Sequence, residues 1–457
     1  MNAKSIYDKS PAFLQDVFLT FQAFKYRSFR KGGQYKNFVD ILNQTEHYTS
    51  EQVFGWKIQQ FRKVFGEAYN NTAYYKRIFD EAGINPFTIE NFDFLKKLPI
   101  LTKSELRESP KDFINKERKI VYTAKTGGTT GAPLETPFDA ESTQWASAYL
   151  TRFFQQVGVR YGSRNVHMTG QQVVPLNEKR KFWRTDMIGN SLYLSIHHLG
   201  PNTFTEYWSK ILKFKPNYIF GYTSFIYELA RYININNNSG KVKLKGVFPS
   251  SEKLTDDMRK EMMIAFDCHV YDHYGSTEGI PLITQCKNGK YHVVPESGII
   301  EFIDSEGLPA KPGEPSEMIM TSLRQFSRPL LRYKIGDTAI YSNESCSCGL
   351  HWPVISELTG RLSEWITLQN GRRVSQFSHQ VFKLVSSVVE SRIIQHTYTD
   401  FELLIVKGDK YGSAEEDFIR KRIFELIGSS VNVQFKYMKS IPKTGGGKKP
   451  TLISKVS

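Results

Sequence analysis

KTGGTTGAP, at residues 125–133, is the strongest local signal in this sequence. Its glycines allow the backbone to bend so that several amides point at one anion, and its threonine hydroxyls and Lys125 add donors and positive charge. The stretch therefore predicts a phosphate-binding loop. It lacks the GxxxxGK[ST] spacing, so it is not the P-loop of nucleoside triphosphatases. An ordinary flexible loop is the alternative interpretation.

Further motifs follow this loop in chain order. They are YDHYGSTEG (271–279), LRYKIGD (331–337), GRLSEW (360–365) and IPKTGGGKK (441–449). The first offers an aromatic ring, a hydroxyl and a carboxylate, the second ends in an Asp after a Gly, and the last places lysines among glycines. Each motif alone is weak evidence, but their order along one chain is specific.

The pattern of apolar residues predicts an α/β protein with a large N-terminal and a small C-terminal domain. Residues 10–85 have helical spacing, and residues 121–360 alternate β-branched runs with helical stretches, as in an α/β body. Thr102 and Ser104 are possible caps of a short helix. After residue 361 the pattern becomes that of a small α+β domain, with a helix from about Ala414 to Leu426. We therefore expect a multi-layer domain at 1–361, with a helical start at 1–110 and a body at 111–361, and a second domain at 362–457.

Composition limits the class of protein. The 457 residues include 61 Lys and Arg against 46 Asp and Glu, 40% hydrophobic residues and 4 Cys. These values exclude disordered, collagen-like and disulfide-stabilised chains. No run approaches the roughly 18 apolar residues of a membrane span, and no secretory signal is recognisable, so we expect a cytoplasmic protein. No nucleic-acid-binding motif accompanies the net charge of +15, and we expect no nucleic-acid partner.

A basic, aromatic segment lies near the N-terminus. Between Asp16 and Asp40 every charged residue is positive, and the charges alternate with aromatic residues: Lys25, Arg27, Arg30, Lys31 and Lys36 with Phe24, Tyr26, Phe29 and Tyr35. This suits peripheral association with an anionic surface such as the inner face of a membrane. A solvated basic face is the alternative.

A second constellation combines three of the cysteines with a histidine. Cys286, His292, Cys346 and Cys348 offer three thiolates and an imidazole, which match a closed structural Zn²⁺ site. Unpartnered reduced thiols are the alternative, and Cys268 or His351 could replace one ligand.

Taken together, the ordered motifs resemble those of the adenylate-forming superfamily of acyl- and aryl-CoA synthetases and adenylation domains. LKKLPILTKSELRE (95–108) and the cysteine segment resemble the phenylacetate-CoA ligase and CapK-like capsule-biosynthesis branch. The resemblance implies a two-step reaction with ATP and Mg²⁺. A carboxylate attacks the α-phosphate and releases pyrophosphate, and a nucleophile then takes the acyl group.

The resemblance also implies roles for individual residues. The loop would bind the leaving phosphates through Thr126, Gly127, Gly128, Thr129, Thr130 and Gly131. Thr277 and Glu278 would act at the α-phosphate, with Glu278 helping to bind Mg²⁺. The nucleoside would contact Ser251, Glu252, Tyr274, Gly275, Asp337 and Arg361. A turn cap is the alternative role of Asp337.

Lys448 matches the mobile catalytic lysine of the resembled family. A cation there would neutralise charge on the carboxylate and phosphate as they approach. Lys443 or Lys449 could substitute for it, and a flexible basic tail is the alternative. Ser363 and Glu364 stand at the family's hinge, where Ser replaces the usual first acid.

The acyl pocket is expected between the phosphate loop and the 271–279 motif. The candidates are Trp145, His167, Phe220, Gly221 and Tyr222, although the aromatic rings could equally pack in the core. The acceptor is an amine or hydroxyl in surface-polysaccharide assembly, such as an amino sugar or amino acid, or else CoA. A nucleotide-binding regulator without activity is a further alternative, which the presence of Lys448 and Glu278 disfavours.

Overall fold

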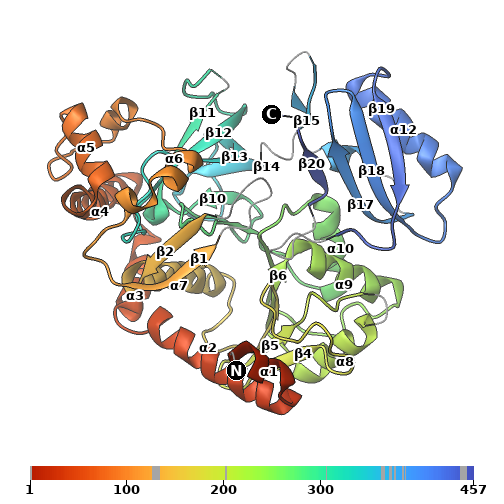
Figure 1. Cartoon of the computed structure of the whole chain (residues 1–457). Helices are drawn as coiled ribbons and strands as arrows, with labels where there is room; N and C mark the ends of the chain where they lie inside the picture. The colour runs from red at the N-terminus through yellow and green to blue at the C-terminus, as the bar shows by residue number, and fades with distance from the viewer. Residues whose placement is uncertain are drawn as a thin grey trace. The chain divides into compact units, whose positions relative to one another are not determined.

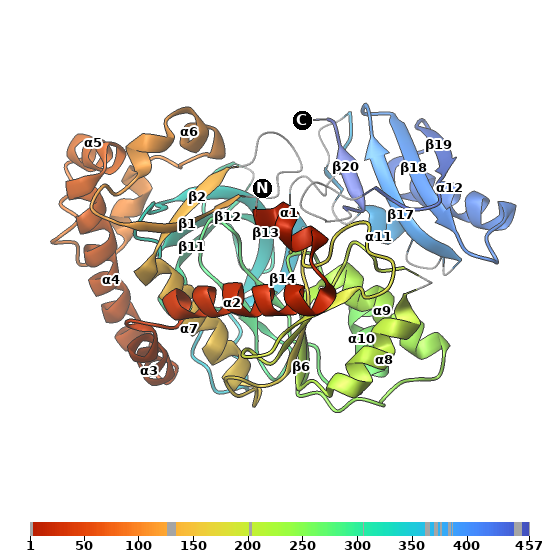
Figure 2. The same ribbon diagram turned by 60° about the horizontal axis from the view of Figure 1, so that its bottom comes forward.

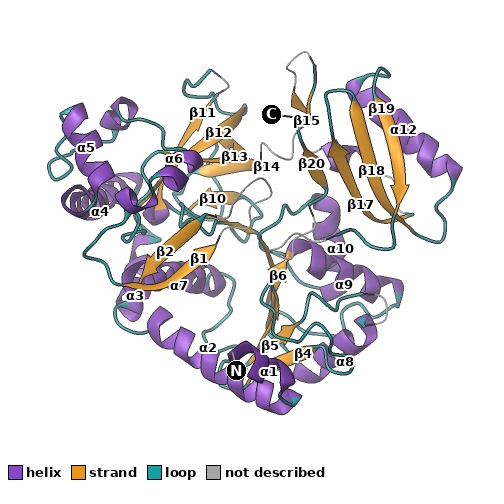
Figure 3. Ribbon diagram, in the orientation of Figure 1, coloured by secondary structure: helices purple, strands orange, loops and turns teal. Residues whose placement is uncertain are grey.

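A computed structural model describes residues 3–125, 134–200, 203–304, 306–361, 366–369, 373–374, 377–382, 385, 387–442 and 450–456. The chain forms two compact units. The first comprises Met1–Phe302, Ile319–Ile335 and Tyr341–Ser356, and the second Ile303–Met318, Gly336–Ile340 and Glu357–Ser457. Both contain helices and strands (Figure 1, Figure 3), in agreement with the predicted mixed α/β class. The predicted boundary at residue 361 stays a prediction.

The N-terminal part is helical, as predicted. Thr49 caps the start of α4, the longest described helix, with a capping box. The Thr49 hydroxyl accepts a hydrogen bond from the Gln52 amide, and the Gln52 side chain accepts one from the Thr49 amide. Thr102 does the same for a short helix, as the sequence predicted, with Glu105 as its partner. These helices are α1 (Ala3–Lys9), α2 (Ala12–Arg30), α3 (Tyr35–Thr45), α4 (Ser50–Asn71), α5 (Ala73–Ala82), η1 (Asp93–Lys97), α6 (Lys103–Glu108) and η2 (Pro110–Phe113).

A five-stranded sheet in the order β4-β5-β3-β6-β7 forms the centre of the α/β body. Strands β5, β3, β6 and β7 run parallel, and β4 is antiparallel at the edge. Their bounds are β3 (Asn165–Met168), β4 (Trp183–Asp186), β5 (Ser191–Leu194), β6 (Tyr218–Tyr222) and β7 (Gly246–Ser250). Parallel strands covered on both faces read as nearly continuous apolar runs, which explains the β-branched segments of the sequence.

Alternate residues of these strands enter two separate cores. Val166, Ile219 and Val247 pack with the helices α8 (Phe204–Phe214), α9 (Thr223–Ile235) and α10 (Asp256–Phe266). Phe220 and Phe248 point to the opposite face. There they contact Phe153 and Phe154 of α7 (Ala140–Gln155). The period of two thus places every second side chain of β6 under α7. Figure 2 shows α8, α9 and α10 grouped together beside β6.

A second, seven-stranded sheet has the order β11-β12-β13-β14-β10-β9-β8. It contains β8 (His273–Tyr274), β9 (Ile283–Gln285), β10 (Tyr291–Val293), β11 (Gly298–Ile303), β12 (Pro315–Ser322), β13 (Tyr333–Ser342) and β14 (Val354–Arg361), with η3 (Pro295–Ser297) before β11. The hairpin of β1 (Ile120–Lys125) and β2 (Glu135–Asp139) carries the residues 126–133 between its strands, which lie outside the described residues.

The second unit includes a four-stranded sheet in the order β19-β18-β17-β20. Its α12 (Ser413–Ile427) buries Ile419 and Ile423 against strand residues such as Phe401 and Leu403, and it occupies the residues where the sequence predicted a helix. The other elements are β15 (Ile366–Thr367), β16 (Arg373–Val374), α11 (Phe377–Phe382), β17 (Val388–Gln395), β18 (Asp400–Lys407), β19 (Asn432–Tyr437) and β20 (Leu452–Ser454). Among the described helices, none is long and apolar enough to cross a membrane.

Candidate active site and metal centre

The carboxyl ends of β6 and β7 are joined through Glu252. Ser251 has a positive φ of 68°, and this turn directs the next residue toward the start of α9. There the Glu252 carboxylate accepts a 2.8 Å hydrogen bond from the Ser224 amide, and its carbonyl accepts one of 3.1 Å from the Thr223 hydroxyl. Glu252 thus satisfies a free amide at a helix N-terminus and fixes the strand ends where ligands bind in open α/β sheets.

The 271–279 motif brings a buried carboxylate next to these strand ends. The Ser250 hydroxyl lies 3.4 Å from Nε2 of His273, which begins β8. Four residues after Tyr274, the side chain of Glu278 is only 4% exposed, and its Oε1 lies 3.3 Å from Nζ of Lys103 on α6. Gly275 and Thr277 are exposed and Tyr274 is half-buried. The turn therefore has the exposed residue Thr277 directly next to the buried residue Glu278.

An aromatic group connects the four strands β3, β5, β6 and β8. His167 stacks on Tyr193 with ring centroids 4.8 Å apart and meets Phe220 edge to face, while Phe220 stacks on His273. Burial lowers the pKa of both His167 and His273 to about 4, because the cation is poorly solvated there. The two imidazoles are therefore neutral at pH 7 and form an uncharged wall that can contact an apolar or aromatic acyl group.

The other acyl-pocket candidates lie in different surroundings. A Cβ atom at Gly221 would collide with the carbonyl of Met168, so only glycine allows this close approach of β6 to β3. Tyr222 is the N-cap of α9. Trp145 stacks on Phe38 at 4.0 Å in the helical core. Among the described residues, no ring contact joins Trp145 to His167 or Phe220.

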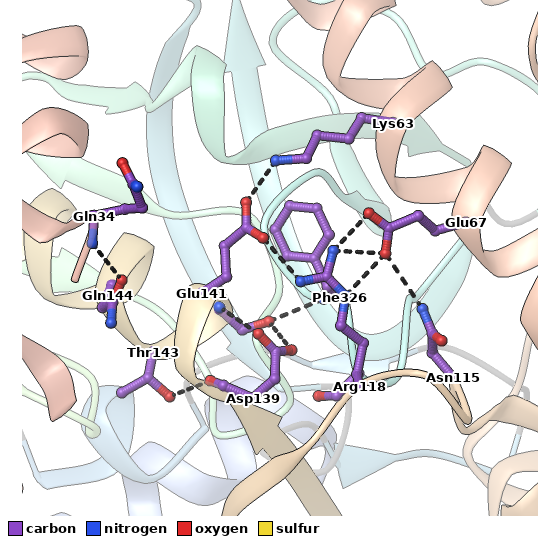
Figure 4. A network of polar contacts seen from close by, with 12 residues as sticks. Gln34, Lys63, Glu67, Asn115, Arg118, Asp139, Glu141, Thr143, Gln144 and Phe326 are labelled. Atoms are coloured by element: carbon purple, nitrogen blue, oxygen red, sulfur yellow. Dashed lines mark hydrogen bonds and ion pairs between the residues drawn. The ribbon is translucent and has the colours of Figure 1, made fainter.

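A charged network closes the base of the β1–β2 hairpin (Figure 4). Arg118, just before β1, donates to Glu67 of α4 and, at 2.8 Å, to Glu141, just after β2. Lys63 donates to the same Glu141 at 2.6 Å, and both cations lie over the ring of Phe326. The network thus joins the chain just before β1 to the chain just after β2, at the end of the hairpin where Ile120 pairs with Asp139.

The remaining site candidates are less completely described. Thr126, Gly127, Gly128, Thr129, Thr130, Gly131, Lys448 and the hinge residues Ser363 and Glu364 lie outside the described residues. Arg361 is described only through its backbone, as the last residue of β14. Asp337 is buried on β13 after Gly336, which has a positive φ of 84° within the strand. Asp337 belongs to the second unit.

The four predicted metal ligands lie together. The ligand atoms of Cys286, His292, Cys346 and Cys348 are all within 4.8 Å of one another. Sγ of Cys286 is 3.8 Å from Sγ of Cys346, and Sγ of Cys348 is 3.5 Å from Nε2 of His292. Cys268 packs against the apolar core around α8, α9 and α10 and is not one of the four.

These spacings fit a tetrahedral zinc ion. Zinc–sulfur bonds of about 2.3 Å and zinc–nitrogen bonds of about 2.0 Å put two sulfurs about 3.8 Å apart and a sulfur and a nitrogen about 3.5 Å apart. Nδ1 of His292 lies 3.2 Å from the carbonyl of Trp352, so it can carry the proton and leave Nε2 for a metal. The donor set and its outer partner both suit Zn²⁺.

Three residues of these sites were absent from the sequence predictions. Lys103 lies in LKKLPILTKSELRE but is 175 positions from Glu278, and no periodicity links them. Arg118 is one of many surface-type cations in the sequence. His273 could have been found, because it stands inside the YDHYGSTEG motif directly before the predicted adenine-stacking Tyr274.

Comparisons with known proteins place the chain among its relatives. Residues 366–455 match the CapK C-terminal domain family. Protein CapK of Staphylococcus aureus is 28% identical over 99% of both chains. The phenylacetate-coenzyme A ligase of Thermus thermophilus is 20% identical over 85% of this chain and 86% of its own.

Solved structures agree with this placement. The structure of 2-hydroxyisobutyryl-CoA ligase in the postadenylation state with 2-HIB-AMP has a TM-score of 0.72 at 18% identity and covers 90% of this chain and 91% of its own. An anthranilate CoA ligase with anthranoyl-AMP has a TM-score of 0.51 at 15% identity and covers 80% of this chain and 71% of its own. The chain is therefore a homologue of CapK, is related to the phenylacetate-coenzyme A ligases and has the fold of the adenylate-forming ligases.

Proposed function

We propose that the chain is an ATP-dependent, AMP-forming ligase. A carboxylate oxygen of the acid attacks the α-phosphorus, the bond to the β-phosphate oxygen breaks, and pyrophosphate leaves. The acceptor then attacks the acyl carbon and AMP departs. The observation that carries the proposal is Glu278, a buried acid whose described contact is one lysine at 3.3 Å, in a chain that aligns with CapK over 99% of its length. Homology to CoA ligases and the shared fold support the same activity.

The described residues suit this chemistry. Glu278 would provide an oxygen ligand for Mg²⁺, and the metal would supply positive charge to the phosphates. Lys103 holds the Glu278 carboxylate in place, and the Arg118 network holds the base of the hairpin whose loop would bind the leaving phosphates. The neutral rings of His167, Phe220 and His273 would contact the acyl group without adding charge.

The acceptor is proposed to be an amine or hydroxyl in surface-polysaccharide assembly. The match over the full length of CapK and at the CapK C-terminal domain supports this choice. CoA is the second candidate, because relatives at 20–25% identity are phenylacetate-coenzyme A ligases. If AMP is released only when an amino sugar or amino acid is added, the acceptor is an amine or hydroxyl. If AMP is released only when CoA is added, the acceptor is CoA.

Acid-dependent ATP–pyrophosphate exchange tests the first half-reaction. A panel of aryl acids, fatty acids, amino acids and uronic acids is incubated with wild type, Lys448→Ala and the matched controls Lys443→Ala and Lys449→Ala. We expect exchange with one acid class, lost only in Lys448→Ala. ATP binding without exchange for any acid would instead indicate a nucleotide-binding regulator.

A boundary at residue 361 and a C-terminal domain that swings about residues 363–364 belong to the same proposal. The family match beginning at residue 366 supports the boundary. A swing would let one cleft serve two half-reactions in turn. Limited proteolysis is expected to cut near residues 362–365, and to do so more slowly when an adenylate analogue is bound. Equal cleavage throughout the chain would argue against this arrangement.

We also propose that the Cys286, His292, Cys346 and Cys348 cluster holds a structural Zn²⁺. The close fit of two interatomic distances to tetrahedral geometry supports the assignment. Elemental analysis of purified protein should give one zinc per chain, and Cys346→Ser should lose the metal and melt at a lower temperature. Cys268→Ser is the matched control and should retain both the zinc and the melting temperature of wild type. Metal-free wild type with unchanged stability would leave the cysteines as reduced thiols.

A further inference from the structure

Helix α2 is fixed to the body by one polar side. Oδ1 of Asp16 accepts a 2.8 Å hydrogen bond from the amide of Thr185 in β4, and Oγ1 of Thr20 accepts one of 3.2 Å from the amide of Met187. Gln15 and Leu19 are buried on the same side. With residues 15, 16, 19 and 20 facing inward, the spacing of a helix turns the positions between them toward solvent.

Those outward positions are apolar. Phe13 is 64% exposed, Phe21 71% and Phe24 53%, and the exposed set of this helix also includes Leu14, Val17 and Phe18. We call these six residues the α2 outer face. Ile6 of α1 and the turn residues Met187 and Ile188, beside Thr20, are exposed as well. Figure 2 shows α1 and α2 lying at the front of the molecule, with β6 below them and no ribbon drawn over α2.

Such a face is unusual on a protein surface. Single exposed apolar side chains are common, but a continuous apolar row along a helix marks a contact surface. Helix α2 also carries Asp16, Lys25, Arg27 and Arg30 and is not apolar enough to cross a membrane, so its apolar row suits a helix that lies flat at an interface.

The charges around the outer face are mostly positive, though fewer than the sequence predicted. Arg27 pairs with Asp186, and Lys31 is drawn over the ring of Tyr161 at 4.1 Å, so these two cations do not point to solvent as expected. Burial lowers the pKa of Lys31 to about 8. The exposed cations are Lys9, Lys25, Arg30 and Lys36. Asp16, the acid of α2, is bound to Lys181 at 2.9 Å.

We propose that the α2 outer face docks on the surface of a bilayer that contains anionic phospholipid. The aromatic and aliphatic side chains would enter the boundary between headgroups and acyl chains, while Lys9, Lys25, Arg30 and Lys36 would face the anionic headgroups. A bilayer suits this surface better than a second copy of the chain, because the same cations would face each other across a symmetric contact. The inference is independent of the proposed ligase activity.

Vesicle flotation of the full chain tests the proposal. We expect binding to phosphatidylcholine vesicles containing about one third phosphatidylglycerol, at least roughly 10-fold weaker binding to pure phosphatidylcholine, and weakening by salt. Phe13→Glu/Phe21→Glu should reduce binding to the anionic vesicles by roughly 10-fold or more at unchanged melting temperature.

Ile235→Glu/Ile264→Glu is the matched control, because these side chains are 72% and 59% exposed on other helices. It should bind like wild type. Wild type that does not float, or equal binding by both double variants, would overturn the proposal. A wild-type dimer that Phe13→Glu/Phe21→Glu converts to a monomer, without vesicle binding by wild type, would overturn it in favour of self-association.

Discussion

Glu296 and Glu278 are both buried glutamates of the first unit, at 1% and 3% exposure, but their partners differ. Glu296 accepts two bonds from Arg152, at 2.7 and 3.0 Å, and a third from Thr45. Glu278 has one lysine at 3.3 Å. A fully paired buried acid serves the fold, because its charge is already neutralised. The Glu278 carboxylate accepts one described side-chain hydrogen bond, from Lys103, and is also attracted to Arg328, so it keeps lone pairs for the ligand role that we propose for it.

The largest expected effect comes from breaking the complete pair. Arg152→Ala leaves the Glu296 charge buried without its guanidinium partner and should lower the free energy of unfolding by about 3–5 kcal/mol, measured by urea denaturation. Arg152→Met/Glu296→Gln removes both charges and should recover most of this loss. A single variant as stable as wild type would mean that the pair is not structural.

Glu278→Gln should separate activity from stability. The amide keeps the shape but removes the charge, so pyrophosphate exchange should fall by roughly 100- to 1,000-fold, comparable to the loss of one electrostatic group in an active site. The free energy of unfolding should change by less than about 1 kcal/mol, because Lys103, which loses its charged partner, is 30% exposed and can be solvated. Exchange above half the wild-type rate would place Glu278 with the structural acids.

Lys103→Ala should have a smaller effect on the same reaction. Without its cation, the Glu278 carboxylate is less firmly positioned, and exchange should fall by roughly 10-fold, with a higher Mg²⁺ requirement than wild type. Lys76→Ala, which removes an exposed pair with Asp80 at 3.2 Å, is the matched control and should leave exchange unchanged. If the Mg²⁺ dependence does not move, Lys103 does not act through Glu278.

The smallest expected effect is on the pH dependence of the free energy of unfolding. Arg152 holds the pKa of Glu296 below its ordinary value of 4.5, in spite of burial. A depressed folded-state pKa adds stability that is present above pH 4.5 and is lost as the pH falls through the folded value. Glu296→Gln should therefore flatten the decline of unfolding free energy between pH 5 and pH 3, by about 1 kcal/mol. An unchanged decline would contradict this role.

Local patterns predicted the elements better than they predicted contacts. The Thr102 cap, the helix at α12 and the alternating strands follow from short-range chemistry, and the residues that carry them are adjacent in sequence. The cluster of Cys286, His292, Cys346 and Cys348 was also predictable, because cysteine and histidine are rare in this chain and restrict the choice.

Contacts between residues far apart in the chain could not be predicted from the sequence. Lys103 and Glu278 meet only because α6 and the 271–279 turn are brought together by the fold. Trp145 was a candidate for the acyl pocket or for the core, and its stack on Phe38 depends on the packing of α3 against α7, which the sequence does not give. The contacts of Arg27 with Asp186 and of Lys31 with Tyr161 could not be predicted either, because each joins residues far apart in the chain. The phosphate loop and Lys448 stay predictions.

Trp352 touches two of the features described above. Its carbonyl lies 3.2 Å from Nδ1 of His292, and its ring lies 4.6 Å beneath the guanidinium of Arg152, in a side chain that is 4% exposed. Indole emission responds to a nearby charge and to the entry of water. The tryptophan is therefore a built-in optical probe, and the difference between the spectra of wild type and Trp352→Phe isolates its signal from that of the other tryptophans. One titration with a chelator and one with urea would then follow the cysteine cluster and the arginine pair through the same chromophore.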